Sequence, residues 1–326
     1  MTLVEQVLSG NRRAIARLIT LAENEGSVAR QALAALYPHT GRAHIVGVTG
    51  ASGTGKSTLV NELTKAYRQR GKTVGIVAVD PTSPFSGGAI LGDRVRMQDL
   101  SGDPGVFIRS MATRGSLGGL ARATSDAVKV LDAAGYQVIF VETVGAGQSE
   151  VEIAEAAHTT IVVTAPGLGD EIQAIKAGIL EIADIFAVNK ADLEGADRAV
   201  TVLRMMLDLD PRPRNWRPPV LKTIALRGEG VEPLIEAIEE HATHLETSGQ
   251  RHQRERERAR GELMDILRHE LMGRLLAGID QTEIEALVER VVERQMDPYS
   301  AAQALLGKEA RGGPESLAKA REPSQG

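Results

Sequence analysis

One stretch, residues 44–58, constrains the fold of this chain more than any other. An apolar, strand-like run there breaks into glycines and then opens a helical pattern. Residues 50–57 match the G-x-x-x-x-G-K-[ST] phosphate loop, and both flanks suit it: 45–48 is typical of a buried strand, and the apolar residues after the loop have helical spacing. A glycine-rich turn that matched by chance would lack these flanks. We therefore predict nucleotide binding.

Each part of this loop has a predicted role. Its glycines allow the backbone N–H groups to turn inward, and the following helix adds the positive end of its dipole. We expect Lys56 to reach the β- and γ-phosphates and to act in catalysis, and Ser57 to ligate Mg²⁺. The residues predicted to bind nucleotide in the loop are Gly50, Ala51, Ser52, Gly53, Thr54, Gly55, Lys56, Ser57 and Thr58.

Around the loop, apolar strand-like runs alternate with helical patterns. Strands are predicted at 44–49, 73–79, 137–142, 159–164, 184–189 and near 220–224, and helices at 56–70, near 117–134, 171–182, 194–208 and 230–246. The strands are continuously apolar, as strands covered on both faces must be. The alternation predicts an α/β fold with a mostly parallel, doubly wound sheet, whose ligands bind at the carboxyl ends of the strands.

The chain changes character on both sides of this region. We expect an N-terminal segment of two or three helices at 1–42, a nucleotide domain at 43–247, a C-terminal helical arm at 248–307 and a disordered tail at 308–326. The mixed-charge run 251–260 is expected to be a solvated helix face. Apolar stripes at 263–275 and 284–292 have no second sheet to cover, so they must pack on the main domain or on another chain. A last short helix is predicted from Asp297-Pro298 to Gly307.

Composition excludes several classes of partner and site. The net charge of −5 and the pI near 5.9 speak against nucleic acid and anionic membranes as partners. The sequence has no cysteine, which excludes disulfides and thiolate metal sites. It also shows neither a signal-peptide pattern at the N-terminus nor an apolar run of the roughly 18 residues that a membrane span needs. We expect a cytoplasmic protein.

Two later turns predict that the base is guanine. Asn189, Lys190 and Asp192 form an N-K-x-D turn directly after the apolar run 185–188. The Asp192 carboxylate can accept hydrogen bonds from guanine N1 and from its exocyclic amine, a pair of donors that adenine lacks. A second base-contacting turn is expected after the last strand, at Ile224, Ala225 and Leu226, where only the backbone role of Ala225 fits because Ile224 replaces the usual serine. The predicted ligands are thus GTP and GDP.

A metal and phosphate site is predicted between these turns. Glu142 begins a variant of the D-x-x-G element that holds the Mg²⁺-bound water, with Glu in place of Asp. The loop 82–93 could be a mere connector between two elements or a switch, and we prefer the switch. It would supply Asp80 or Asp93 to the metal and Arg96 to phosphate. Gln148 either orients the attacking water or simply begins a helix. Slow intrinsic hydrolysis that a partner accelerates is the expected consequence.

Three long blocks, 80–97, 142–150 and 166–178, resemble the MeaB/ArgK family of GTPases, and the resemblance covers about residues 45–246. It implies a Mg²⁺-dependent GTP hydrolase that forms a homodimer through its C-terminal arm and acts as a chaperone of adenosylcobalamin-dependent methylmalonyl-CoA mutase. By the same resemblance, Asp80, Asp93, Arg96 and Glu142 belong to the Mg²⁺ and phosphate site. Residues 167–177 would form a third switch facing the mutase; its named residues are Gly167, Asp170, Glu171 and Lys176.

Three other functions compete with this one. A kinase or ATPase acting on a transport component has no use for a guanine-reading Asp192. A metallochaperone GTPase for nickel or cobalt needs soft or imidazole ligands, whereas this chain has no Cys and seven His without paired spacing. An interaction scaffold with an inactive site would not need Lys56, Ser57, Glu142 and Asp192 together. The residues themselves do not name the partner.

Overall fold

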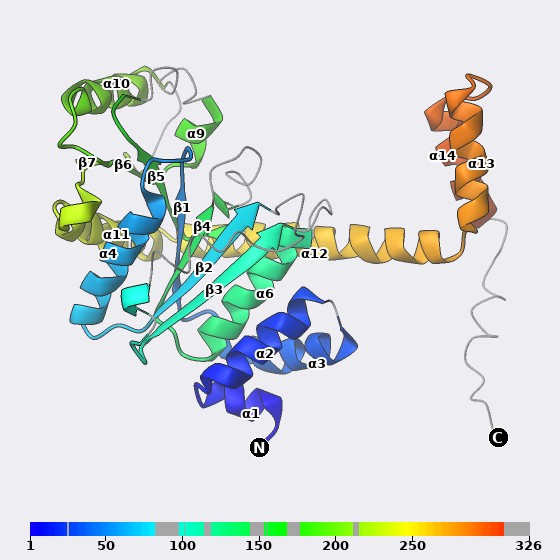
Figure 1. The fold of residues 1–326 in the computed structure, drawn as a ribbon, viewed down its shortest axis with the longest axis horizontal. Coiled ribbons are helices and arrows are strands. Elements are labelled where there is room, and N and C mark those ends of the chain that lie inside the picture. The colour runs from blue at the N-terminus through cyan, green and yellow to red at the C-terminus, as the bar shows by residue number, and fades with distance from the viewer. Residues whose placement is uncertain are drawn as a thin grey trace. The chain divides into compact units, whose positions relative to one another are not determined.

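The computed structural model describes residues 1–24, 26–81, 98–100, 102–113, 119–143, 153–154, 156–167, 177–210 and 215–309 (Figure 1). The chain divides into two compact units, Met1–Arg258 and Ala259–Gly326. The first unit contains the predicted nucleotide region and also the N-terminal helices. The division falls inside the segment that the sequence assigned to the helical arm.

The first unit is built on a seven-stranded sheet in the order β3-β2-β4-β1-β5-β6-β7. All neighbouring strands are parallel. This confirms the predicted fold class. The strands are β1 (His44–Thr49), β2 (Val74–Pro81), β3 (Val106–Thr113), β4 (Val138–Thr143), β5 (Thr159–Thr164), β6 (Ile185–Val188) and β7 (Val220–Lys222).

Helices cover both faces of the sheet. Alternate residues of β4 show the division: Phe140 packs with α4 (Lys56–Gln69) and α11 (Val231–Thr247), whereas Ile139 packs on the opposite face. The other helical elements of this unit are α1 (Leu3–Leu8), α2 (Arg12–Glu23), α3 (Ser27–Leu36), η1 (Tyr37–His39), η2 (Gln98–Leu100), α6 (Gly119–Ala133), α9 (Ala177–Ile182), α10 (Ala196–Leu209) and η3 (Ala225–Arg227).

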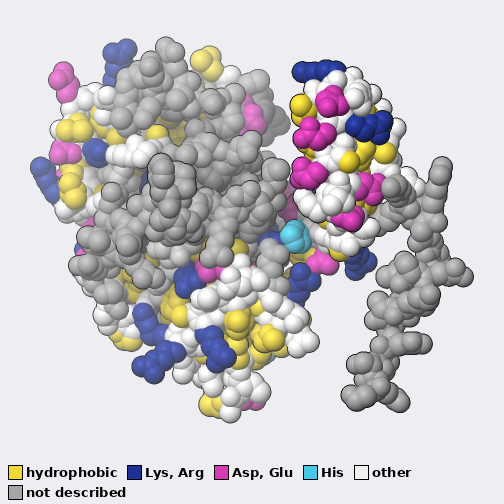
Figure 2. Space-filling model, turned by 45° about the vertical axis from the view of Figure 1, so that its right-hand side comes forward, with side chains coloured by type: hydrophobic (Ala, Val, Ile, Leu, Met, Phe, Trp, Pro, Cys, Tyr) yellow, Lys and Arg dark blue, Asp and Glu magenta, His cyan; other side chains and the backbone are white. Residues whose placement is uncertain are grey.

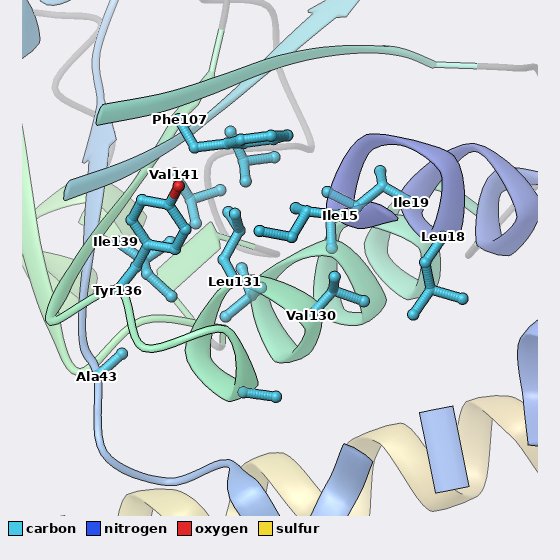
Figure 3. Close-up of a cluster of buried hydrophobic side chains, with 14 of the residues drawn as sticks. Ile15, Leu18, Ile19, Ala43, Phe107, Val130, Leu131, Tyr136, Ile139 and Val141 are labelled. Atoms are coloured by element: carbon cyan, nitrogen blue, oxygen red, sulfur yellow. The ribbon is translucent and has the colours of Figure 1, made fainter. Parts of the chain in front are cut away.

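The N-terminal helices share one buried core with α6 and the sheet (Figure 3). Ile15 and Leu18 of α2 are fully buried and lie in the same cluster as Leu131 of α6 and Phe107 of β3. Burying such apolar side chains contributes about 1.5–3 kcal/mol each. The helices α1–α3 therefore form part of the first unit.

Strand β3 is absent from the sequence prediction, and that omission was wrong. Its apolar start, 106–108, is followed by Arg109 and Ser110, so the run is too short and too polar to match a buried strand. β3 lies at the edge of the sheet, where polar residues are tolerated. Arg109 forms an ion pair with Glu23 of α2, with a nitrogen–oxygen distance of 2.5 Å.

The start of α12 (Gln250–Ala277) is also not the solvated face that its mixed charges predicted. Arg254 donates to both carboxylate oxygens of Asp184, at 2.8 and 3.0 Å, and to the carbonyl oxygen of His158 at 2.7 Å. Arg258 donates to the carbonyl oxygen of Ala156 at 3.2 Å. These arginines find buried acceptors at the amino ends of β5 and β6, which no local sequence pattern reveals.

A buried polar chain lies at the same end of the sheet. Thr159 Oγ1 is 2.8 Å from His44 Nε2 and 2.8 Å from His241 Nδ1. His241 Nε2 lies 3.3 Å from Asp184 Oδ1 without hydrogen-bond geometry. The backbone N–H of Ile45 donates to His158 Nδ1 at 3.1 Å. Burial lowers the pKa of His44 to about 4 and that of His158 to about 2.

The second unit is helical. It contains the remainder of α12, then α13 (Gln281–Val292) and α14 (Pro298–Glu309). Asp280 caps α13 by accepting the Thr282 N–H at 3.0 Å. The prediction that Gly307 ends the last helix was wrong: α14 continues to Glu309, since a glycine inside a helix costs only about 1 kcal/mol.

Apolar residues of these helices reach the surface between charged ones (Figure 2). No residue of α12 or α13 is buried. The exposed large side chains are Leu263, Met264, Ile266, Leu267, Leu271, Met272, Leu276, Val288, Val292, Tyr299 and Leu306. Among the helices that the structure describes, none combines the length and the hydropathy that crossing a membrane requires.

Candidate functional site

The phosphate loop lies between β1 and α4, and its glycines are required by close contacts. Gly50 has φ +138°, and a Cβ there would lie 2.1 Å from the carbonyl oxygen of Val163 on β5. Gly55 has φ +90°, and a Cβ there would lie 2.4 Å from Asn189 Nδ2. The loop thus packs against two neighbouring strand ends with no room for side chains at these positions.

The two chemically active residues of the loop are buried. Lys56 is 5% exposed, and its ammonium donates to the carbonyl oxygens of Gly50 and Ala51 at 2.7 and 2.9 Å. Ser57 donates its hydroxyl to Glu142 Oε1 at 2.5 Å. Glu142 is 1% exposed and lies on β4, next to β1 in the sheet, at the register position of Val48. The fold therefore brings together Ser57 and Glu142, which are 85 positions apart.

These groups fit a Mg²⁺-bound nucleotide. Mg²⁺ prefers oxygen ligands, and one or two carboxylates with a hydroxyl and phosphate oxygens are its usual set in such sites. The hydroxyl of Ser57 and the carboxylate of Glu142 supply two such oxygens side by side. The glycine loop, Lys56 and the N-terminus of α4 supply the positive charge and the N–H groups for phosphates.

Asn189 joins the phosphate loop to both base turns. Its Nδ2 donates to the carbonyl oxygen of Thr54 at 2.8 Å, and its Oδ1 accepts from Thr223 Oγ1 at 3.1 Å and from the Ala225 N–H at 3.0 Å. The side chain is 2% exposed. Asn189 thus fixes the phosphate loop, its own N-K-x-D turn and the turn after β7 relative to one another.

The Ala225 N–H was predicted to meet the guanine oxygen, and this stays a prediction. In the structure that N–H donates to Asn189 Oδ1, because the 3-10 helix η3 begins at Ala225 and turns the amide toward the Asn side chain. Ile224 forms a bridge with Glu229, and Leu226 is 87% exposed beside the turn.

Lys190 and Asp192 lie at the outer edge of the site. Lys190 has φ +57°, and its ammonium donates to the carbonyl oxygen of Gly53 at 2.7 Å. The side chain of Asp192 is 38% exposed, with a guanidinium nitrogen of Arg227 3.8 Å from its Oδ2. Its carboxylate is therefore accessible to a ligand that offers a pair of N–H donors.

Other predicted site residues lie wholly or partly outside the described residues. Asp93, Arg96, Gln148, Asp170, Glu171 and Lys176 belong to this group. Asp80 pairs with Ala112 at the end of β2, while its side chain is outside the described part. Gly167 follows β5 with φ +87°. The structure thus places the phosphate loop, Glu142 and the N-K-x-D turn together.

Sequence reasoning missed one group beside the site. Lys65 and Asn61, both on α4, contact Asp99 of η2 at 2.6 and 3.3 Å. Asn61 and Lys65 follow Ser57 by four and by eight positions along α4, a spacing that the sequence shows, whereas no sequence pattern indicates Asp99 as their partner.

Comparisons with known proteins agree with this geometry. The profile of the family described as "Methylmalonyl Co-A mutase-associated GTPase MeaB" matches residues 15–280. A protein of Pyrococcus abyssi is 54% identical over 314 residues, covering 95% of this chain and 97% of that protein. A Caenorhabditis elegans protein named "methylmalonic aciduria type A homolog, mitochondrial" is 32% identical over 292 residues, covering 83% of this chain and 72% of that protein.

A solved structure is similar over nearly the whole chain. The crystal structure described as an LAO/AO transport system kinase is 26% identical, with a TM-score of 0.73, and the match covers 94% of this chain and 96% of that one. The likeness thus includes the N-terminal and C-terminal helices as well as the sheet.

Proposed function

Since the chain belongs to the MeaB family and is a GTPase, we propose that it couples GTP binding and hydrolysis to the loading or protection of adenosylcobalamin on methylmalonyl-CoA mutase. The observation that carries the hydrolase part is the buried contact between Ser57 and Glu142 beside Lys56. The family description and the name of the nematode relative support the mutase as partner. The loading or protection of adenosylcobalamin would take place in the cytoplasm.

In this proposal each residue of the site has a defined task. The glycine loop and Lys56 bind the phosphates, and Lys56 offsets charge that grows on them in the transition state. Ser57 and Glu142 would hold Mg²⁺, which would neutralise charge on the phosphate oxygens. The Asp192 carboxylate selects guanine by accepting its two neighbouring N–H groups. Asp80, Asp93 and Arg96 would complete the metal and phosphate contacts, and Gln148 would orient the attacking water.

The hydrolase site is tested by replacing its charged residues. Lys56→Ala should weaken nucleotide binding and abolish turnover, whereas Glu142→Ala should mainly lower turnover. Lys72→Ala serves as a control, since Lys72 is an exposed residue between α4 and β2. Hydrolysis by Lys56→Ala at the wild-type rate would show that the site is assigned wrongly.

The partner is tested by capture from native cytosol with GDP and with a non-hydrolysable GTP analogue. We expect a cobalamin-dependent mutase to be retained differently in the two states, and to stimulate hydrolysis. Lys176→Ala should keep intrinsic hydrolysis and lose this stimulation if residues 167–177 form the third switch. Full stimulation of the Lys176→Ala variant would place the coupling elsewhere.

We also propose a homodimer formed through the second unit. Exposed leucines, methionines and valines lie on α12–α14. In the part of the chain that the structure describes, no residue of α12 or α13 is buried. A second copy of the same surface would remove this apolar area from water. Light scattering of the full chain tests the proposal; a monomer would contradict it.

A kinase of a transport component is the second candidate, because the similar solved structure is described as one. The exposed Asp192 carboxylate next to Lys190 favours a guanine nucleotide. Phosphate transfer from GTP to a protein rather than to water, followed with labelled γ-phosphate, would favour the kinase.

A further inference from the structure

Two buried threonines are hydrogen-bonded to each other directly beside the site. Thr143 Oγ1 donates to Thr49 Oγ1 at 3.1 Å, although the two residues are 94 positions apart. Neither side chain is more than 1% exposed. Thr49 is the last residue of β1 before the phosphate loop, and Thr143 directly follows Glu142 on β4. The hydrogen bond therefore joins the strand that leads into the phosphate loop to the strand that carries the Glu142 carboxylate.

This hydrogen bond lies at the end of the pairing between β1 and β4. The backbone register of the two strands extends up to the pair of Val48 and Glu142. Thr49 and Thr143 are each one residue further along, and their side chains connect the strands there. The hydroxyl contact thus extends the link between β1 and β4 as far as the first residue of the phosphate loop.

The threonine pair and the metal-binding pair lie on opposite faces of the sheet. Side chains alternate along a strand, so Thr143 shares a face with Val141, which packs in the core formed with α2 and α6 (Figure 3). Glu142 shares the other face with Phe140, which packs against α4. On that face its carboxylate accepts from the Ser57 hydroxyl at 2.5 Å. The end of β4 is therefore held by β1 from one face and by α4 from the other.

Stability alone does not explain two hydroxyls at this place. The same face of the sheet carries valines and isoleucines, and a pair of valines would have nearly the shape of the threonine pair. Replacing both partners of a neutral hydrogen bond by apolar groups of the same shape is nearly neutral for stability. A hydrogen bond differs from an apolar contact because it sets a distance and a direction between its two partners. The threonine pair therefore fixes the separation of β1 and β4 beside Glu142.

We propose that Thr49 and Thr143 are positioning residues for GTP hydrolysis. Their hydrogen bond keeps the Glu142 carboxylate in place beside the Ser57 hydroxyl. Because Mg²⁺ sites demand near-ideal octahedral geometry, a small displacement of β4 relative to the phosphate loop is enough to weaken such a site. The inference rests on the proposed role of Ser57 and Glu142 as Mg²⁺ ligands. Neither threonine needs to touch the nucleotide.

The test removes the hydroxyls and keeps their shape. The double variant Thr49→Val with Thr143→Val loses the hydrogen bond but keeps the packing, so the melting temperature of the nucleotide-free protein should stay close to the wild-type value. Its kcat for GTP should fall by roughly 10- to 100-fold, because small misplacements of groups around a reacting centre cost up to about 100-fold. Calorimetry with GDP gives a second readout. Mg²⁺ should strengthen GDP binding less in this variant than in the wild type, whereas the GDP affinity in EDTA should be unchanged.

A conservative variant and a matched control accompany the valine pair. Thr49→Ser with Thr143→Ser keeps both hydroxyls and should retain most of the kcat that the valine pair loses. Thr64→Val is the control, because Thr64 is a fully buried threonine of α4 whose hydroxyl donates to the carbonyl oxygen of Val60 at 2.7 Å. It lies about two helical turns beyond Ser57. Thr64→Val should keep the wild-type kcat and the wild-type effect of Mg²⁺ on GDP binding.

Three results would overturn the proposal: wild-type kcat in the valine pair, an equal loss of kcat in the serine pair, or a lower kcat with an unchanged effect of Mg²⁺ on GDP binding. Glu142→Ala, measured alongside, separates this proposal from the assignment of the metal site. If Glu142→Ala loses turnover and the effect of Mg²⁺ while the valine pair behaves as the wild type, only the positioning role fails. If Glu142→Ala itself behaves as the wild type, the metal site is assigned wrongly.

Discussion

At the scale of single residues, Asn189 shows how much of the site depends on the fold. Its position in N-K-x-D predicts contact with the nucleotide, yet all its described side-chain hydrogen bonds go to protein groups of the phosphate loop and the second base turn. Thr54 and Ala225 lie 135 and 36 positions away from Asn189, so no sequence spacing predicts these contacts. They follow only once β1 and β6 lie on either side of β5.

We predict that Asn189→Asp destabilises the protein as well as the site. Aspartate keeps the acceptor for Ala225 but faces the carbonyl oxygen of Thr54 with a second acceptor instead of a donor. Leaving such buried groups unmatched costs about 1–3 kcal/mol. Urea unfolding should show this loss, together with weaker GDP binding. Asn24→Asp, whose Nδ2 donates to an exposed carbonyl oxygen of Thr20, is the control.

Asp192→Asn should change the choice of base. The amide offers one acceptor and one donor where guanine requires an acceptor for two N–H groups, so GTP binding should fall by roughly 10- to 100-fold. Xanthosine nucleotides, which present an oxygen in place of the exocyclic amine, should bind better than to the wild type. Calorimetry with GDP, ADP and XDP measures this, and Asp197→Asn, which affects an ion pair with Lys222, is the control. Equal affinity of the wild type for GDP and ADP would refute guanine selection.

At the scale of elements, the apolar strands were the easiest part to predict. Each predicted strand lies within two residues of an observed one, because continuous apolar runs of this length are typical of strands covered on both faces. The edge strand β3 was missed because polar residues interrupt its apolar run. One of them, Arg109, forms an ion pair with Glu23 of α2. The attachment of α12 was missed for a related reason. A run of charged residues in a helix predicts a solvated face. Only the folded sheet shows that the buried carboxylate of Asp184 accepts hydrogen bonds from Arg254.

The buried histidines at this end of the sheet predict acid sensitivity. His44 and His158 are held neutral by burial, with Arg251, His241 and Asp184 near the first, and Arg258, His44, Arg251 and Arg254 near the second. Their pKa values of about 4 and about 2 lie below the unfolded value of 6.5, so the unfolded chain binds more protons below pH 6.5. The free energy of unfolding should therefore fall as pH drops below about 6.5, by about 1.4 kcal/mol per pH unit for each group.

Urea unfolding at several pH values between 7 and 4 checks this. His44→Asn should reduce the slope of stability against pH because one of the two groups no longer titrates. His252→Gln, at an exposed position of α12, should leave the slope unchanged. A stability that does not depend on pH over this range would contradict the burial of neutral histidines.

At the scale of the whole molecule, the sequence predicted a nucleotide domain ending at 247 and an arm that begins at 248. The structure instead includes Arg254 and Arg258 in the first unit, because their guanidinium groups satisfy Asp184 and the carbonyl oxygens before β5. A boundary drawn from composition follows the change in residue types. The physical boundary follows the last residues that contact the first unit, which here are Arg254 and Arg258.

This difference leads to a prediction about two shortened chains. A chain that ends at Ser248 loses the Arg254 partner of the buried Asp184, and an uncompensated buried charge costs about 3–5 kcal/mol. A chain that ends at Arg260 keeps this pair and lacks the exposed apolar residues of α12–α14. We expect the longer chain to be monomeric, to bind GDP as the full chain does and to have nearly its melting temperature, whereas the shorter chain melts earlier. Light scattering and thermal unfolding of both chains decide this. If the Ser248 chain is as stable as the Arg260 chain, the Arg254–Asp184 pair does not stabilise the first unit, and if the Arg260 chain is still dimeric, the second unit is not the dimer interface.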